Sequence, residues 1–215
     1  MHEVITDPTF DQTEIERKKV RWLAAIDQSL STPNGMVSNL IPEILYGENH
    51  PYAKPFSGNG TRESIQWMSR EDLINYKQRF IAPSNASLIV VGDTTLDEIV
   101  PMLESQFGKL AENKMLKGVQ LNYEVENQSE TRKVYLVDKP GAVQSLIVAG
   151  QLMPAIGSSD EIDIDLMNRV IGGSFTARLN MNLREDKSWS YGVRARLSQY
   201  KGPRPMLVYA PVPVS

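Results

Sequence analysis

Residues 172–192 read GGSFTARLNMNLREDKSWSYG and combine a glycine pair, a helical segment and the expected start of a strand. The glycine pair opens the helical segment, and Arg184 stands near the end of that segment. Tyr191 follows Arg184 at the point where the strand would begin. One turn can therefore direct a guanidinium and a phenol toward the same cleft.

Arg184 and Tyr191 are the candidate functional residues because of the donors that they carry. A guanidinium and a phenol together suit a peptide carbonyl, or the oxyanion that forms when that carbonyl is attacked. A purely structural explanation competes with this one. Arg184 would complement the C-terminal dipole of its helix, and Tyr191 would pack where the strand starts. On these residues alone, the structural explanation is the simpler.

The composition indicates a globular protein, one large domain or two small ones, that is large enough to bury a core. The chain has 215 residues, of which 41% are hydrophobic and 23% charged, with a formal net charge of -3. Nothing in it forms a basic block that would neutralise a row of phosphates, so we expect no nucleic-acid partner. No apolar run approaches the roughly 18 residues of a transmembrane helix, so we expect no membrane span.

Metal ligands are scarce in this sequence. It has no cysteine and two histidines, His2 and His50. A catalytic zinc usually takes three protein ligands, mostly histidine with carboxylate, so we expect no metal site in this chain. His50 lies beside Pro51 with no histidine four residues further on, and we interpret it as a residue that anchors a loop.

The periodicity and the capping residues favour an α+β fold, with mixed or antiparallel sheets and helices packed on one face. Capping pairs predict helix starts at Asp11, Ser69, Thr95 and Ser158. Helices are expected over 11–30, 36–46, 61–68, 69–80, 95–107 and 158–173, and strands over 86–93, 133–137, 144–150, 191–200 and 206–210. Lys19 is the one polar residue on the apolar face of the first long helix.

Several blocks, in the right order, resemble the pitrilysin/insulinase-type zinc peptidase family, which includes the mitochondrial processing peptidase. The resemblance covers most of the chain, and each block alone is weak. The blocks are DPTF at 7–10, LYG at 45–47, HPY at 50–52, PSNASLIVVGD at 83–93, VYLVDKPGAVQS at 134–145, and residues 172–192.

The resemblance implies that Arg184 and Tyr191 belong to the half of the peptidase opposite the zinc. There they would bind the substrate backbone and help stabilise the transition state in trans. The zinc half carries His-x-x-Glu-His on a helix and a distant glutamate. The present sequence has no His-x-x-Glu-His, and Ala25 stands where the distant glutamate would fall. The expectation is a zinc-less half, inactive as a peptidase by itself, with zinc supplied by a partner subunit or half.

The resemblance also implies a domain division. Residues 1–120 would be the C-terminal part of one peptidase-like lobe, 121–132 a polar linker, and 133–215 the N-terminal part of a second, similar lobe. Open sheet edges would then favour self-association. The expected partners are a zinc-bearing half and a peptide substrate. A structural scaffold of the same fold with no role in proteolysis is the alternative function. The compartment is not identified by the residues, although the absence of cysteine and the family's bacterial members favour the periplasm.

Overall fold

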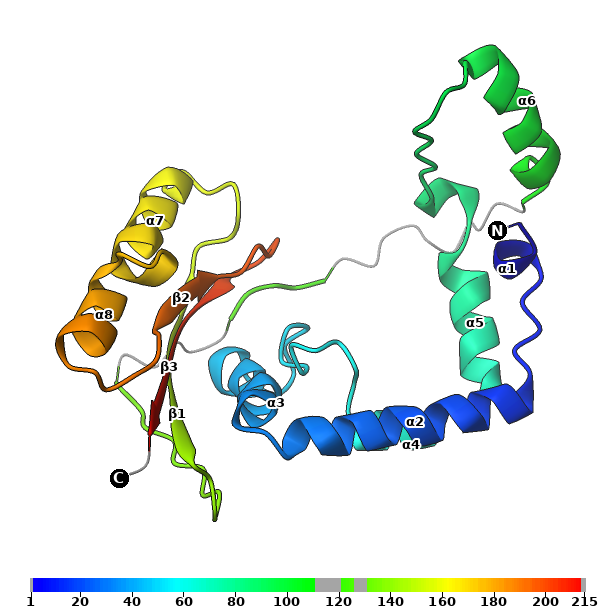
Figure 1. Cartoon of the computed structure of the whole chain (residues 1–215). Coiled ribbons are helices and arrows are strands. Elements are labelled where there is room, and N and C mark those ends of the chain that lie inside the picture. The colour runs from blue at the N-terminus through cyan, green and yellow to red at the C-terminus, as the bar shows by residue number, and fades with distance from the viewer. Residues whose placement is uncertain (1, 111–120, 126–130, 214–215) are drawn as a thin grey trace. The chain divides into compact units, whose positions relative to one another are not determined.

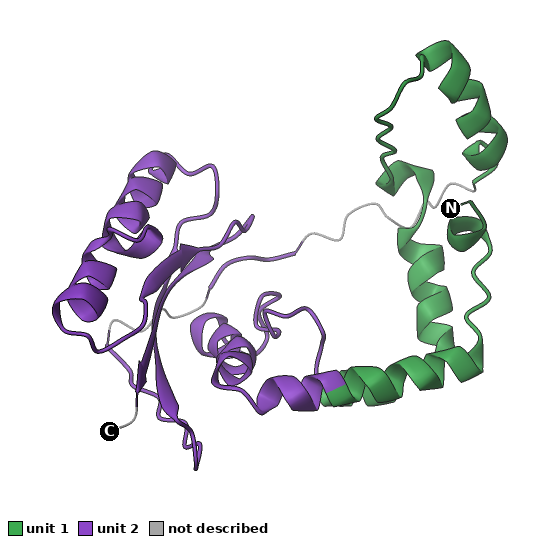
Figure 2. Cartoon of the chain, in the orientation of Figure 1, with its two compact units in different colours: residues 1–24, 62–120 green, residues 25–61, 121–215 purple. Residues whose placement is uncertain are grey.

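The computed structural model describes residues 2–110, 121–125 and 131–213. Spatial clustering divides the chain into two units, which Figure 2 colours separately. Unit 1 holds residues 1–24 with 62–120, and unit 2 holds residues 25–61 with 121–215. The predicted lobe boundaries stay a prediction, and part of the predicted linker, 126–130, lies outside the described residues.

Unit 1 is helical in its described part (Figure 1). Its elements are α1 (His2–Thr6), most of α2 (Gln12–Leu30), α4 (Arg62–Trp67), α5 (Arg70–Phe80), the 3-10 turn η1 (Pro83–Asn85) and α6 (Leu96–Phe107). Capping residues set three of the helix starts as predicted. Asp11 accepts from the Glu14 amide at 3.0 Å, Ser69 and Asp72 form a reciprocal capping box, and the Thr95 amide donates to Glu98 at 3.1 Å.

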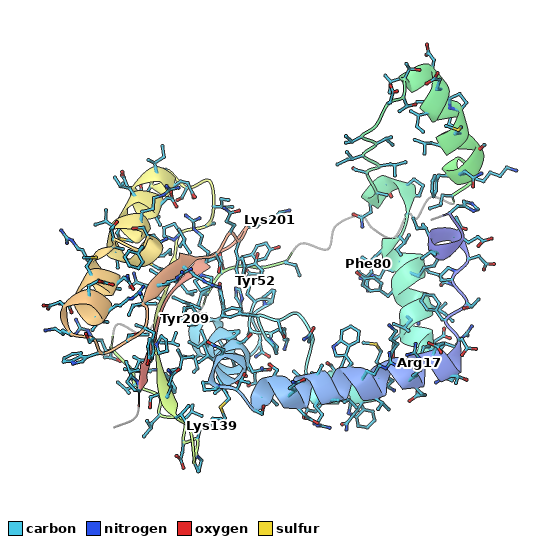
Figure 3. The ribbon with its side chains drawn as sticks, viewed as in Figure 1. Arg17, Tyr52, Phe80, Lys139, Lys201 and Tyr209 are labelled. Carbon is cyan, nitrogen blue, oxygen red and sulfur yellow. The ribbon has the colours of Figure 1, made fainter. Side chains whose placement is uncertain are left out.

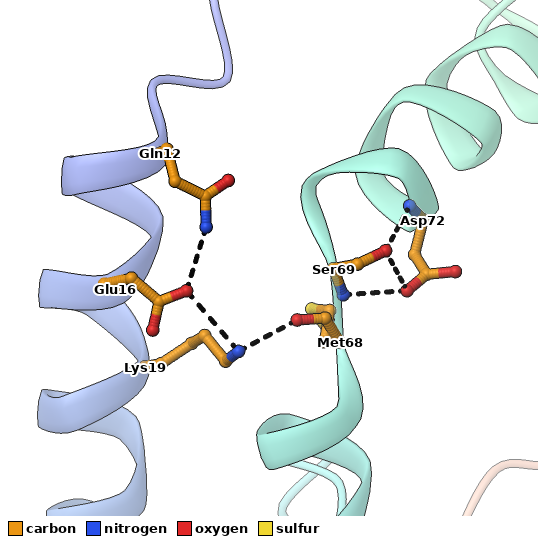
Figure 4. A network of polar contacts seen from close by, with 6 residues as sticks. All are labelled: Gln12, Glu16, Lys19, Met68, Ser69 and Asp72. Atoms are coloured by element: carbon orange, nitrogen blue, oxygen red, sulfur yellow. Dashed lines mark hydrogen bonds and ion pairs between the residues drawn. The ribbon is translucent and has the colours of Figure 1, made fainter.

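Lys19 has a clear structural reason to occupy the apolar face of α2. Its ammonium donates to the Met68 carbonyl at 2.9 Å, just after α4, and lies 3.6 Å from Glu16 (Figure 4). Orphan carbonyls at a helix end attract cations. The neighbouring Ser69 and Asp72 then begin α5. A single lysine thus links α2 to the junction between α4 and α5.

Unit 2 contains α3 (Pro33–Tyr46), a three-stranded sheet and a helical layer. The sheet consists of β1 (Gln144–Met153), β2 (Arg194–Leu197) and β3 (Arg204–Pro213); the helical layer consists of α7 (Glu161–Asn168), η3 (Arg169–Gly173), α8 (Arg178–Asn180) and η4 (Met181–Asp186). Helix α3 begins three residues earlier than predicted. Thr32 is its N-cap, and Pro33 occupies the first turn, because proline is tolerated where no amide hydrogen is required.

The sheet is antiparallel with β3 in the centre, in the order β1-β3-β2. Gln144 pairs with Pro213 and Met153 with Arg204, so β1 and β3 match along their full length. Met206 and Leu207 on β3 are 6% and 4% exposed and belong to the core. In Figure 1, α7 and α8 lie together on one side of this sheet. The predicted α+β class is confirmed.

Close contact between the helical layer and β2 depends on Gly172. A Cβ added at Gly172 would lie 2.7 Å from the Ala195 amide nitrogen, which is closer than van der Waals contact allows. Arg204 adds a polar link between β3 and α7. It is 1% exposed, donates to Glu161 at 3.0 and 2.8 Å, and donates to the Pro154 carbonyl at 2.9 Å.

Four predictions of local structure are wrong or too long. The segments 86–93 and 133–137 are extended but form no strand in the described part of the chain, because a strand needs a hydrogen-bonding neighbour as well as apolar residues. Strand β2 is shorter than the predicted 191–200. Helix α7 has Asp160 rather than Ser158 as its N-cap, and the Glu161 carboxylate accepts from the Gly157 amide at 3.1 Å. No helix in the described residues is both long and apolar enough to cross a membrane.

Candidate functional site

Arg184 lies on the π-helix η4, which continues α8. The Lys187 amide donates to the Asn182 carbonyl at 3.0 Å, five residues back, as the wider π-turn requires. Single π-helical turns inside α-helices occur frequently at functional sites. The glycine pair does not open the helical segment, contrary to the prediction. Gly172 and Gly173 end η3, and the helix resumes only at Arg178.

The Arg184 side chain is partly exposed and has two recorded neighbours. Its Nε lies 3.3 Å from a Glu185 carboxylate oxygen, in a pair whose side chains are each 42% exposed. Its guanidinium carbon lies 4.8 Å from the centroid of the Phe175 ring, which is a cation–π distance. Phe175 is 58% exposed. The guanidinium therefore rests on an aromatic ring at the protein surface.

The turn after η4 is closed by its own backbone. The Ser188 amide donates to the Arg184 carbonyl at 3.1 Å, and the Trp189 amide donates to the Leu183 carbonyl at 2.8 Å. Ser188 has φ of 54°, in the left-handed region that residues other than glycine seldom adopt. This conformation reverses the chain and carries it toward Tyr191.

Tyr191 is 80% exposed, although its immediate neighbours in sequence are held tightly. The Ser190 hydroxyl is buried, donates to the Pro211 carbonyl on β3 at 2.6 Å, and accepts from the Gly192 amide at 3.2 Å. Val193, which is 1% exposed, leads directly into β2. The phenol therefore projects into solvent from a backbone that is fixed to the sheet.

Asn180 forms hydrogen bonds to both ends of the segment 175–193. Its side-chain amide donates to the Phe175 carbonyl at 2.7 Å and accepts from the Val193 amide at 3.0 Å. The residue is 3% exposed. Asn180 and Ser190 were both missed in the sequence. The available signal was an asparagine within a helical apolar segment, where its side chain competes with the backbone for hydrogen bonds.

Around Arg184 the exposed surface carries aromatic and charged groups of both signs. Phe175 and Trp189 are each 58% exposed, and the Lys187 ammonium lies 5.3 Å from the Trp189 ring centroid. Lys187 also lies 3.7 Å from Asp186. Exposed aromatic rings combined with donors suit the binding of a polypeptide, in which apolar side chains alternate with carbonyl and amide groups.

Among the residues that the structure describes, no three histidine, aspartate or glutamate side chains gather as metal ligands. The His50 ring stacks on Tyr46 at 4.7 Å, and its Nδ1 accepts from the Tyr52 amide at 3.0 Å. Tyr52 in turn lies close to Lys201 (Figure 3). These contacts confirm His50 as a loop anchor. Ala25 is exposed on α2 and offers no ligand atom.

Comparison with known proteins gives relatives of about twice this length. The chain is 25% identical over 201 residues to a Bacillus subtilis protein named "Uncharacterized zinc protease YmxG", covering 94% of this chain and 46% of that protein. It is 26% identical over 200 residues to "Non-peptidase homolog YmxG" of Helicobacter pylori, covering 91% and 44%. The chain thus spans less than half the length of these relatives.

A solved structure has the same fold. The crystal structure of a peptidase M16 inactive domain from Pseudomonas fluorescens matches 99% of this chain and 50% of that chain, with a TM-score of 0.80 and 22% identity. The family model described as "Peptidase M16 inactive domain" matches residues 68–215, which include the whole region from Phe175 to Val193. The chain therefore belongs to the family described as the peptidase M16 inactive domain.

Proposed function

We propose that this chain is the non-catalytic half of an M16-type peptidase, and that Arg184 and Tyr191 bind the backbone of a peptide substrate there. A partner half would hold the zinc and supply the activated water. The observation that carries the proposal is the contrast within residues 175–193: two donor side chains are exposed, while the backbone beside them is anchored by buried Asn180 and Ser190. Donors on a fixed backbone need little reorganisation when substrate charge develops.

The ion pair with Glu185 would not prevent Arg184 from binding a substrate. Both side chains of that pair are 42% exposed, and exposed ion pairs contribute about 0.2–1 kcal/mol. A hydrogen bond from a charged donor to a partner in a water-excluded site contributes about 1.5–3 kcal/mol. A peptide carbonyl enclosed between the two halves can therefore replace Glu185 as the partner of Arg184.

The test measures cleavage of fluorescein-labelled casein by a zinc-bearing M16 half in the presence of this chain. Arg184→Ala should lower kcat/KM by about tenfold or more, since about 1.4 kcal/mol of transition-state stabilisation is a factor of ten. Tyr191→Phe removes only the phenol donor and should have a smaller effect. Arg178→Ala, on the same helix, and Tyr76→Phe, in unit 1, are matched controls. Unchanged cleavage by both site variants would exclude the proposed role.

A structural scaffold without any role in proteolysis is the second candidate. The Helicobacter pylori relative is named a non-peptidase homolog. If this candidate is correct, the protein raises the thermal stability of its partner, and the casein cleavage rate is the same with wild-type chain and with Arg184→Ala.

A second copy of the chain is a further proposed partner. The segment 134–137 in unit 2 is apolar and extended, with Val134 94% and Leu136 95% exposed. Its backbone forms no strand ladder within the part of the chain that the structure describes. Such a segment can pair with a strand of another chain.

A further inference from the structure

Asn180 is buried yet carries a polar side chain that both donates and accepts. At 3% exposure, an amide without partners would be unfavourable, because it loses its hydrogen bonds to water. Both partners of Asn180 are main-chain groups, and their chemistry fixes the orientation of the amide. The Val193 N–H can only donate, so it faces Oδ1, and the Phe175 carbonyl can only accept, so it faces Nδ2. No apolar side chain of similar size can replace both bonds.

The two partners of Asn180 lie on opposite sides of the candidate site. Phe175 precedes the helix, and its ring supports the Arg184 guanidinium at 4.8 Å. Val193 follows Tyr191 by two residues and is the last residue before β2. One side chain therefore connects the ring under the guanidinium to the backbone that carries the phenol.

We infer that Asn180 is a positioning residue, a clamp that sets the Phe175–Arg184 pair and the Tyr191 backbone relative to each other. Ser190 holds the other side of Tyr191 by its hydrogen bond to Pro211. Because the residues on both sides of Tyr191 are hydrogen-bonded to buried groups, the backbone at Tyr191 can adopt few conformations. The clamp itself depends only on the contacts of Asn180; its effect on peptide binding rests on the proposed function.

The first test needs no ligand and uses the full 215-residue chain. Asn180→Ala should speed amide hydrogen exchange at Val193 by about tenfold or more, because its acceptor is lost. Asn180→Asp keeps an acceptor for Val193 but removes the donor to Phe175. The Val193 amide should then stay protected, while the ring-current shift of the Arg184 Nε–H resonance, caused by Phe175, decreases.

Asn182 provides the matched control, since it is an exposed asparagine two residues further on. Asn182→Ala and Asn182→Asp should leave both signals as in the wild type. If Asn180→Ala unfolds the chain, Asn180→Asp still separates the two ends of the clamp. Unchanged Val193 exchange in a folded Asn180→Ala, or an unchanged Arg184 resonance in Asn180→Asp, would overturn the inference.

The second test connects the clamp to peptide binding. With the zinc-bearing half and fluorescein-labelled casein, Asn180→Asp should lower kcat/KM by about fivefold. In an Arg184→Ala background, the same change should have little further effect, because residues that act through one another are not additive. Full additivity would assign Asn180 a general structural role. If Arg184→Ala has no effect while the Val193 and Arg184 signals respond to Asn180 variants, the proposed function fails and the clamp stands.

Discussion

Strand β3 and the segment 134–137 both lie in unit 2, and both are rich in apolar residues. Leu207 on β3 is 4% exposed, with β1 and β2 paired on either side and other apolar side chains packed around it. Leu136 is 95% exposed, and its backbone has no strand beside it in the described residues. The comparison shows that burial of an apolar residue is decided by its neighbours in space, since the residue type is the same in both places.

The exposures within the unpaired segment follow a strand pattern nevertheless. Val134 and Leu136 are 94% and 95% exposed, whereas Tyr135 and Val137 are 56% and 50% exposed. Such alternation with a period of two is typical of extended backbone with one face partly covered. Tyr135 contributes to a shallow groove that Leu40 and Ile44 of α3 also line. One face of this segment is thus partly covered and the other is bare.

The largest expected effect comes from making the same substitution in both regions. Leu207→Ala should lower the free energy of unfolding by about 2–5 kcal/mol, because it leaves a cavity in the core. Leu136→Ala should change it by no more than about 0.5 kcal/mol, since the side chain is already in solvent. Urea unfolding followed by far-UV circular dichroism measures both. Equal losses would mean that Leu136 is buried in solution and would contradict the comparison.

Gly172→Ala tests the close packing of the helical layer on the sheet. The added Cβ would lie 2.7 Å from the Ala195 amide nitrogen and 2.8 Å from the Ala195 Cβ. Backbone and side chain must shift, at a cost of about 1–3 kcal/mol in the free energy of unfolding. Gly92→Ala is the control, because an added Cβ there meets no atom within 4 Å. A stabilised Gly172→Ala variant would show that the helical layer does not approach β2 so closely.

The smallest expected effect concerns the bare face of 134–137 and is measured by sedimentation. Val134→Lys combined with Leu136→Lys should weaken self-association by about tenfold, since charges on an unpaired strand oppose pairing. Ile162→Lys is a control on α7, where Ile162 is 81% exposed. A monomeric wild-type protein at all concentrations, or equal weakening by Ile162→Lys, would contradict association through this segment.

Local signals in the sequence were sufficient for the helix starts that a side chain caps. Ser69 with Asp72 and Thr95 with Glu98 predicted helix starts that the structure confirms, because each cap is formed within four residues. Helix α3 begins earlier than predicted because Pro33 suits the first turn of a helix. Helix prediction succeeded where the stabilising contact was local.

Contacts between residues far apart in the chain could not be predicted from the sequence. The segment 133–137 reads as a strand, yet whether it pairs depends on chain segments far away. Asn180 acts through Val193, 13 residues further on, and Lys19 through Met68, 49 residues further on. Arg184 and Tyr191 could be selected in advance because the resemblance marked them, whereas the buried residues that hold them could not. The role of the two exposed donors stays a prediction, and their buried supports were not predicted.

The central position of β3 has a consequence for the synthesis of the protein. β1 and β2 do not pair with each other, and both require β3, which is made after them. Ser190 also needs the Pro211 carbonyl. The ribosome adds roughly 5–20 residues per second. Several seconds therefore pass between the synthesis of β1 and that of β3, and during this time β1 lacks its pairing strand. The backbone that carries Tyr191 can therefore be fixed to the sheet only after the Pro211 carbonyl on β3 has been made.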